Sequence, residues 1–240
     1  MNQPFEQELQ SSWQERQEYA EMMLPIIGKL YRNKSIEISV YGRTLLNASA
    51  IDVIKAHRKV RLHEGIKLRL RESYPILEAI NSMQLAPAQI DIGKLAFDFH
   101  YGSAVDKTDL NAYLKDKLAD VVDKSDDHEP QDVVLYGFGR IGRLLARLMI
   151  ERQGQNNKLR LRAIVVRGGR DGDLEKRASL LRRDSVHGPF NGSITIDHER
   201  NALKANGSYI QVIYANSPDE IDYTEYGINN ALVIDNTGIW

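Results

Sequence analysis

A glycine-rich turn that directly follows a short apolar run constrains the fold of this 240-residue chain more than any other feature. Residues 132–136 read Asp-Val-Val-Leu-Tyr, and residues 137–142 read Gly-Phe-Gly-Arg-Ile-Gly. An amphipathic stretch then continues to Arg152. The order predicts a strand, a tight turn and a helix, and a G-x-G-x-x-G string is specific only in that setting.

Each glycine of this motif has a separate physical reason. The first, Gly137, permits the tight turn, and the second, Gly139, lets the backbone approach a pyrophosphate with no Cβ in the way. The third, Gly142, lets the helix pack closely on the strand. Unpaired N–H groups at the positive end of the helix would then hold the phosphates. We therefore expect a dinucleotide ligand, against the alternative of a glycine turn that binds nothing.

The pattern after this helix continues to alternate between strands and helices. Strands are expected at residues 159–166, 192–197, 209–214 and 231–235, and a helix at residues 173–183, with a short helical or turn segment before the last strand. Strands separated by helices in this order predict a parallel sheet with right-handed crossovers. Residues 132–240 are therefore expected to form an α/β Rossmann-type parallel sheet, although an incomplete one.

The first half of the chain has a helical pattern instead. Apolar residues recur at spacings of three and four between residues 13 and 30, which predicts one buried stripe on a helix. Asn47 and Ser49 are candidate N-caps for a second helix running through Ile54. Further helices are expected near residues 66–83 and 106–122, with Pro87 interrupting the pattern between them. We expect a small, mainly α-helical domain at residues 1–125, a polar linker at residues 126–131 and a second domain at residues 132–240.

Composition excludes several classes of site. The chain contains no cysteine, which rules out disulfides, thiolate metal sites and cysteine nucleophiles among these residues, and we expect no metal site. No apolar run approaches the ~20 residues needed to span a bilayer, and the N-terminus lacks the pattern of a secretion signal. We therefore expect no membrane partner and a cytoplasmic location.

Positive charge concentrates in the second half of the chain. Of the 15 Lys and Arg in residues 129–240, 13 lie between Arg140 and Arg183. They could form a solvated basic face or a positive field that attracts phosphorylated ligands. A stand-alone RNA-binding module is a competing interpretation, but no ladder of aromatic side chains for base stacking is interleaved with the basic residues. We therefore do not expect nucleic acid as a partner.

The residue at the end of the second strand of this half bears on the choice of cofactor. An acid at this point usually bonds the ribose hydroxyls of adenosine, but the position holds Arg167. A guanidinium accepts no hydrogen bond but pairs with a 2′-phosphate, in a contact worth roughly 1.5–3 kcal/mol. The cofactor is therefore expected to be NAD or NADP, with Arg167 favouring NADP. The alternative is that Arg167 points to solvent and Asp171 or Asp173 binds the ribose.

Three stretches resemble phosphorylating glyceraldehyde-3-phosphate dehydrogenase, and they occur in the order of that family. They are residues 136–143 (Tyr-Gly-Phe-Gly-Arg-Ile-Gly-Arg), 182–188 (Arg-Arg-Asp-Ser-Val-His-Gly) and 235–240 (Asp-Asn-Thr-Gly-Ile-Trp). The N-terminal segment resembles the extension of long bacterial members, including residues 31–33 (Tyr-Arg-Asn) and 41–43 (Tyr-Gly-Arg). The resemblance covers essentially the whole chain.

The resemblance implies an NAD(P)-dependent oxidoreductase of glycolysis, tetrameric at full length, that oxidises glyceraldehyde 3-phosphate to 1,3-bisphosphoglycerate. It implies that backbone at Arg140 and Ile141 holds the pyrophosphate and that Arg182 lies near the adenine. It also implies that Thr237 and Gly238 pass close to the nicotinamide-side ribose. His187 belongs to a structural motif of the family, so no catalytic residue is expected in this chain. The predicted cofactor-binding residues are Gly137, Phe138, Gly139, Arg140, Ile141, Gly142, Arg167, Arg182, Thr237 and Gly238.

The chain departs from the family pattern in three respects. Tyr136 replaces the asparagine that usually precedes the glycine motif, and Arg167 replaces the usual acid, so strict specificity for NAD is not expected. The nucleophilic cysteine and the later base histidine of the family would lie beyond Trp240. We therefore expect a C-terminally truncated chain, inactive alone, because without a thiolate no thiohemiacetal can form to donate hydride. The alternative function is a stand-alone dinucleotide- or RNA-binding module without catalysis.

Overall fold

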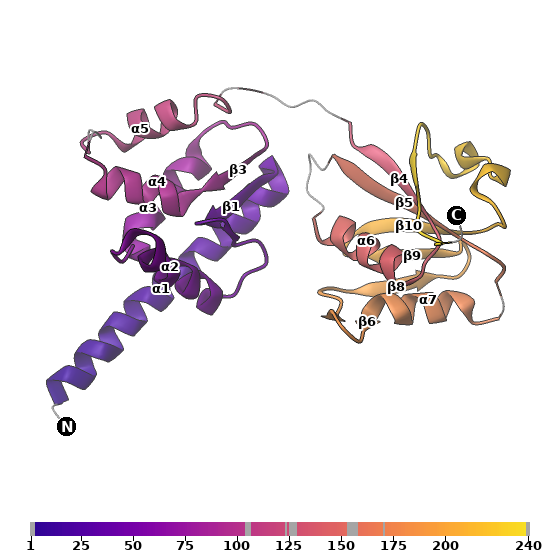
Figure 1. The fold of residues 1–240 in the computed structure, drawn as a ribbon, viewed down its shortest axis with the longest axis horizontal. Helices are drawn as coiled ribbons and strands as arrows, with labels where there is room; N and C mark the ends of the chain where they lie inside the picture. Colours follow the sequence, from indigo (N-terminus) through magenta and orange to yellow (C-terminus); the bar gives the residue numbers. More distant parts are fainter. Residues whose placement is uncertain are drawn as a thin grey trace. The chain divides into compact units, whose positions relative to one another are not determined.

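The computed structural model describes residues 3–103, 107–122, 124, 129–152, 158–169 and 171–238. It divides into two compact units, one within Met1–Asp127 and one within His128–Gln153 and Asn157–Trp240. Each unit has its own hydrophobic core, and Figure 1 shows the helices and strands of each. Residues 126–128 of the predicted linker lie outside the described residues, and Gln131 already belongs to a strand. The division into a domain at 1–125, a linker and a domain at 132–240 stays a prediction.

The first unit is mainly helical, as predicted. Its helices are α1 (Gln3–Lys34), α2 (Ala50–Glu64), α3 (Leu70–Ser82), α4 (Ile92–Tyr101) and α5 (Leu110–Lys117). The prediction missed α4, although Asp91 caps it by accepting a hydrogen bond from the amide of Lys94. The buried Ile92, Ala96 and Phe99 of α4 also have helical spacing. The predicted helix at residues 106–122 is shorter, because the chain leaves the helix after Lys117.

A small sheet within this unit was not predicted. Strands β1 (Ile36–Val40), β2 (Arg43–Thr44) and β3 (Ala88–Asp91) pair in the order β2-β1-β3, with β1 and β3 parallel. Ile36, Ile38 and Val40 alternate with half-buried residues, so the period of two was visible in the sequence. Its partner β3 lies about 50 residues later in the chain, beyond the reach of local pattern reasoning.

Two local devices hold α2 in place. Ser49 and Asp52 form a reciprocal capping box at its start, which confirms Ser49 as the N-cap. Asn47 adopts a positive φ and is not the cap. The buried His57 of α2 contacts the hydroxyl of Ser73 on α3 through Nε2 at 2.6 Å. Burial lowers the pKa of His57 to about 4, so the ring is neutral at ordinary pH.

The second unit is built on a mixed six-stranded sheet in the order β11-β4-β5-β10-β9-β8. The four strands β4 (Gln131–Tyr136), β5 (Leu159–Val166), β10 (Ser208–Tyr214) and β11 (Leu232–Asp235) are mutually parallel. Strands β8 (Ile194–Asp197) and β9 (Ala202–Ala205) add an antiparallel meander at one edge. This is the expected Rossmann-type α/β arrangement, except that the sheet is mixed rather than wholly parallel.

Successive residues of β4 serve the two faces of this sheet. Val133 and Leu135 belong to the core cluster that includes helices α6 (Arg140–Glu151) and α7 (Asp173–Arg182). Val134 and Tyr136 belong to a second cluster with residues of the segment between β10 and β11. That segment contains the 3-10 turns η1 (Pro218–Glu220) and η2 (Tyr223–Tyr226), where a short helical or turn segment was expected. Both faces of the sheet are therefore covered, which accounts for the near-continuous apolar runs of β4 and β5.

The meander at the sheet edge was only partly predicted. Strand β9 was missed, although Asn206-Gly207 joins it to β10 with a positive φ at both residues. An Asn-Gly pair between two strands is a strong local signal for a tight hairpin. A further short ribbon pairs β6 (Arg183–Asp184) with β7 (Gly188–Pro189). In the described part of the chain, no helix is both long enough and apolar enough to cross a membrane.

Candidate cofactor-binding site

The candidate site lies at the point where the chain switches from adding strands on one side of β4 to adding a strand on the other side. From β4 the chain proceeds to β5 and β10 on one side, and it returns to the other side of β4 as β11. Backbone hydrogen bonds tie the carboxyl ends together, from Gly137 N to Val165 O and from Asn236 N to Tyr136 O. In open α/β sheets the crevice outside such a switch point is where ligands bind. The glycine motif, the turn after β5 and residues 236–238 all meet at this edge.

Two of the three motif glycines are required by packing within the protein. Gly137 has a φ of +91°, which L side chains rarely adopt, and a Cβ there would lie 3.0 Å from Cγ2 of Thr237. A Cβ on Gly142 would lie 2.6 Å from the carbonyl oxygen of Gly137 and would collide with the side chain of Asn236. The turn and the close helix–strand contact predicted for these glycines are therefore present.

Gly139 differs from the other two because no packing requires it. Its backbone is extended, with φ −72° and ψ −163°, and an added Cβ would meet no heavy atom within 4 Å. The space in front of Gly139 is open, and a side chain there would extend into it. The need for glycine at this position is consistent with the close approach of a ligand rather than with the fold.

The helix that Gly139 opens has no capping side chain. Gly139 is the N-cap of α6, and its first turn contains no acid but does contain Arg140. By contrast, α2, α4 and α5 are capped by Ser49, Asp91 and Asp109. The first N–H groups of α6 therefore have no side-chain acceptor, and the positive end of the helix dipole has no acid near it. An anion would supply both.

The remaining residues of the motif fall into two groups. Phe138 is buried in the core, where its carbonyl oxygen accepts a hydrogen bond from Arg143 at 3.4 Å. Arg140 and Ile141 are exposed on the first turn of α6. Phe138 therefore offers a possible ligand only its backbone, whereas Arg140 and Ile141 present both backbone and side chain.

The end of β5 carries the residues that bear on the ribose. Arg167 directly follows the strand and is exposed. Asp173 pairs with Arg177 at 2.5 Å, and burial together with Asp173 raises the pKa of Tyr214. Asp173 is thus engaged with its own helix, while Asp171 is exposed in the turn. The exposure of Arg167 fits both interpretations, so its role toward the cofactor stays a prediction.

Residues 235–238 form the opposite wall of the glycine turn. The carboxylate of Asp235 accepts hydrogen bonds from the amide and the hydroxyl of Thr237, both at 2.8 Å. These bonds hold Thr237 beside Gly137, and Gly238 follows with a φ of +70°. Thr237 and Gly238 are thus brought to the glycine motif by the last strand. Their expected proximity to a nicotinamide ribose stays a prediction.

Arg182 lies elsewhere in the unit. It ends α7, and its guanidinium donates a hydrogen bond to the carbonyl oxygen of Ile194 in β8 at 2.7 Å. Strand β8 is the outer strand of the sheet, with β9, β10 and β5 between it and β4. The structure therefore gives Arg182 a structural contact, and its expected place near an adenine stays a prediction.

Much of the basic stretch between Arg140 and Arg183 serves the fold. The buried Arg147 donates hydrogen bonds to the carbonyl oxygens of Leu181 and Gly188, both at 2.9 Å. Asp132 is flanked by Arg160 at 2.7 Å and Arg162 at 3.3 Å. These arginines pair with groups of their own unit, so the basic residues between Arg140 and Arg183 do not form one continuous positive surface for phosphorylated ligands. The internal partners lie tens of residues away in sequence, and local pattern reasoning could not have found them.

The Asp-Ser-Val-His-Gly motif forms a turn held by one carboxylate. Asp184 accepts hydrogen bonds from the amides of Val186 and His187, and these bonds lower the pKa of Asp184. The ring of His187 also contacts Asp184 through Nδ1 at 3.0 Å. His187 is therefore tied into the turn, in keeping with the structural role that the resemblance implies.

Two residues at this edge were not singled out as contributors. Tyr136 was noted only as a departure, yet it is buried, and its hydroxyl donates a hydrogen bond to the carbonyl oxygen of Asn216 at 2.6 Å. Asn236 packs against Gly142, and its Oδ1 is buried without a hydrogen-bond partner among the described residues. Buried polar atoms without partners are rare and often indicate a missing water or ligand. Among the residues that the structure covers, no group of His, Asp and Glu could hold a metal ion.

Comparison with known proteins relates the second unit to a known family. Residues 131–240 match the family described as glyceraldehyde 3-phosphate dehydrogenase, NAD binding domain. A glyceraldehyde-3-phosphate dehydrogenase of Monascus purpureus is 33% identical over 108 residues, covering 45% of this chain and 29% of that protein. One from Thermotoga maritima is 32% identical over 108 residues, again covering 45% and 29%.

A relative from Pseudomonas aeruginosa extends the match to the first unit. A glyceraldehyde-3-phosphate dehydrogenase-like protein of strain UCBPP-PA14 is 53% identical over 222 residues, which is 91% of this chain. The match covers 48% of that protein, so the chain spans about half the length of this relative. Residues 131–240 are therefore a Rossmann-type NAD-binding domain of the glyceraldehyde-3-phosphate dehydrogenase family.

Proposed function

We propose that residues 132–240 bind the pyrophosphate of NAD or NADP at the start of α6. The observation that carries this proposal is the combination of open space at Gly139 with a helix start that has neither a capping side chain nor a nearby acid. A dinucleotide pyrophosphate would supply the missing acceptors and the negative charge. In this proposal the amides of Arg140 and Ile141 donate to the phosphates.

The other predicted contacts extend along the same edge. Thr237 and Gly238 would lie beside the nicotinamide-side ribose, since they stand opposite Gly137. Arg182 would lie near the adenine only if a ligand reaches past β5 and β10. When bound, the nicotinamide would accept hydride from a substrate. The residues of this unit bind and orient the cofactor, and none of them is proposed as catalytic.

The reaction that we propose for the whole enzyme is oxidation of glyceraldehyde 3-phosphate to 1,3-bisphosphoglycerate with reduction of NAD(P). Its support is the family of residues 131–240 and the names of the relatives. A thiolate nucleophile cannot come from these residues, because none of the 240 is cysteine. It would have to be supplied by polypeptide outside them. We further propose a cytoplasmic enzyme that is tetrameric at full length, with residues 1–125 as a helical extension and residues 126–131 as a linker.

The choice between NAD and NADP depends on Arg167. Its exposed guanidinium directly after β5 could pair with a 2′-phosphate. Asp173 is already paired with Arg177 and is a poor candidate for the ribose hydroxyls. We therefore propose that the site accepts both cofactors, with Asp171 as the remaining acid that could bind the ribose of NAD.

Calorimetric titration of the 240-residue chain with NAD and with NADP tests this proposal. Saturable binding of one dinucleotide per chain is expected, and AMP alone should bind more weakly because it lacks the pyrophosphate. Titration with a short RNA in the presence of NAD tests the alternative of an RNA-binding module without catalysis. If neither dinucleotide binds, the proposal is wrong, and RNA binding that NAD does not displace would then favour the alternative of an RNA-binding module.

A further inference from the structure

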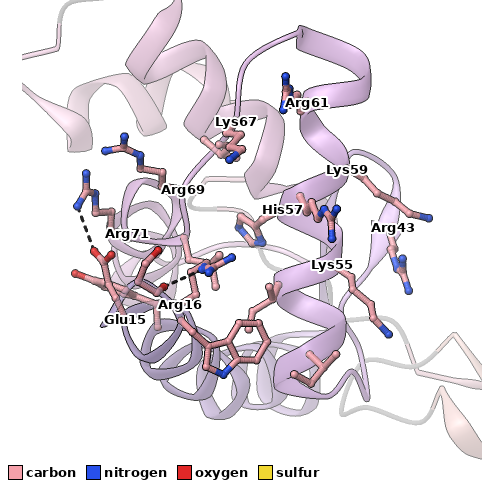
Figure 2. A pocket seen from close by; sticks show the side chains of 18 of the residues that line it. Glu15, Arg16, Arg43, Lys55, His57, Lys59, Arg61, Lys67, Arg69 and Arg71 are labelled. Atoms are coloured by element: carbon pink, nitrogen blue, oxygen red, sulfur yellow. Dashed lines mark hydrogen bonds and ion pairs between the residues drawn. The ribbon is translucent and has the colours of Figure 1, made fainter. Parts of the chain in front are cut away.

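The first unit contains a basic groove that is not part of the candidate cofactor site (Figure 2). It is bounded by the first half of α1, by α2 and by the start of α3. Its volume of about 1530 Å³ exceeds that of ordinary small-molecule pockets. A groove of this size suits a macromolecular segment such as a helix.

Positive charge surrounds this groove. Nine of its lining residues are Lys or Arg, and Glu15 is the one acid among the described residues that line it. Figure 2 shows the basic side chains of α2, among them Lys59 and Arg61, on one side and those of the α3 start, Arg69 and Arg71, on the other. Arg58, Lys59 and Arg61 are exposed and form no ion pair with any acid that the structure describes. The groove therefore favours an anionic occupant.

Apolar side chains accompany this charge. Leu9 and Trp13 of α1, and Ile51 and Leu62 of α2, all line the groove and are 40% to 81% exposed. Three of these four side chains are aliphatic and suit the apolar side of a helix, whereas Trp13 is the one aromatic among them and makes no stacking ladder for nucleotide bases. The occupant that fits both features is an acidic amphipathic helix.

The first half of α1 is itself a helix of that kind. Every side chain described from Glu6 to Gln14 is exposed, and in Figure 1 these turns project beyond the rest of the unit. Leu9 and Trp13 are four residues apart and so share one face. Residues 3–18, the first half of α1, contain four glutamates and one arginine. An unpacked helical segment is marginally stable in water, which favours a partner.

One contact within the chain shows that an acid of α1 can pair with a base of the groove. Glu15 of α1 forms an ion pair with Arg71 of the groove at 3.2 Å. Glu6 and Glu8, about two to two and a half turns earlier, have no basic residue of their own chain within ion-pair distance among the described residues. Thus α1 has acidic side chains without a basic partner in the described part of its own chain, and the groove has basic side chains without an acidic partner there.

We propose that the occupant of the groove is the first half of α1 from a second copy of this chain. The contact is reciprocal, since each copy inserts its acidic α1 half into the basic groove of the other. Such an isologous arrangement closes as a twofold dimer, with the two α1 helices side by side and an α2 on each side. Burial of Leu9, Trp13, Ile51 and Leu62 supplies the affinity, and the charges set the partner and the register.

The test uses charge exchange between two variants of the full chain. Glu6→Lys/Glu8→Lys makes α1 basic, and Arg58→Glu/Lys59→Glu weakens the charge of the groove. Each variant alone is expected to raise the dimer dissociation constant at least about a hundredfold, because like charges then face one another at the substituted positions. An equimolar mixture restores association, because each substituted α1 meets a substituted groove and each native α1 meets a native groove. Sedimentation equilibrium measures both results.

Two controls separate this contact from other self-association. Asp116→Lys/Asp120→Lys makes the same charge change on an exposed surface that does not line the groove, and should leave the dimer intact. Trp13→Ala leaves the net charge unchanged and should weaken association at least about tenfold, through loss of apolar area. Circular dichroism establishes that each variant is folded, so a loss of association is not a loss of structure.

Four outcomes overturn the proposal. The wild-type chain could remain monomeric at every concentration and at low salt. The reversed variants could associate as tightly as the wild type, or fail to restore association when mixed. A monomeric chain could instead bind polyuridylate in a manner abolished by Arg58→Glu/Lys59→Glu, which would assign the groove to nucleic acid.

Discussion

Replacement of Gly139 by valine separates ligand binding from folding. The backbone at Gly139 is extended, and an added Cβ meets no atom of the protein within 4 Å. The free energy of unfolding of the variant should therefore lie within about 0.5 kcal/mol of the wild-type value, as is usual for exposed substitutions without a packing conflict. Its side chain would nevertheless occupy the space in front of the first N–H groups of α6.

The expected loss of affinity follows from the hydrogen bonds that the side chain would block. A hydrogen bond to a charged group is worth roughly 1.5–3 kcal/mol. Loss of one such bond to the pyrophosphate should weaken binding by about tenfold to a hundredfold. NAD and NADP should be affected alike, because the pyrophosphate is common to both.

Gly142→Ala is the matched control, and it should behave in the opposite way. Its Cβ would lie 2.6 Å from the carbonyl oxygen of Gly137, a backbone atom that cannot move aside cheaply. Overpacking of this kind costs about 1–3 kcal/mol, and each kcal/mol lowers the melting temperature of a domain this size by about 4–8 °C. Thermal denaturation and calorimetric titration of the three proteins provide the comparison. If Gly139→Val bound NAD as tightly as the wild type, or lost as much stability as Gly142→Ala, the reasoning would be refuted.

Three further predictions concern single side chains. Burial lowers the pKa of His57 from 6.5 to about 4, so the unfolded chain binds this proton at a higher pH than the folded unit does. The free energy of unfolding of the first unit should be highest above pH 6.5 and should fall by about 3 kcal/mol as the pH is lowered to 4. Urea titrations at several pH values should show this decrease in the wild type but not in His57→Gln. Arg167→Asp should shift the NADP/NAD affinity ratio toward NAD by about tenfold to a hundredfold, and an unchanged ratio in calorimetry would contradict that role. Tyr136→Phe removes the bond to Asn216 and should cost about 1 kcal/mol in chemical denaturation, while an unaltered midpoint would show that the bond contributes nothing.

The parts of the fold that were predicted correctly are those with local causes. The bounds of β5, Leu159–Val166, match the predicted strand, because its apolar run is bounded by polar residues and glycine. Ser49 was a candidate cap, and it does cap α2. The turn at Gly137 and the close packing at Gly142 follow from the motif alone. In each case the determining residues lie within a few positions of one another.

The parts that were missed depend on partners distant in sequence. Strand β1 is stabilised by β3, about 50 residues later, and the arginines around Asp132 lie 28 and 30 residues away from it. A count of charges cannot distinguish an arginine that pairs internally from one that faces solvent. The basic groove was missed for the same reason, since α1, α2 and the start of α3 each contribute only part of it.

The contact between Gly137 and Thr237 has a consequence for the order in which the site assembles. The two residues are 100 positions apart, so the entropy of closing a long loop opposes their meeting. Strands β4 and β5 and the helix between them are close in sequence and can form early, whereas β11 must dock last among the parallel strands. During synthesis the glycine turn therefore exists before its opposite wall, and this edge of the sheet is completed only after residues 236–238 have left the ribosome.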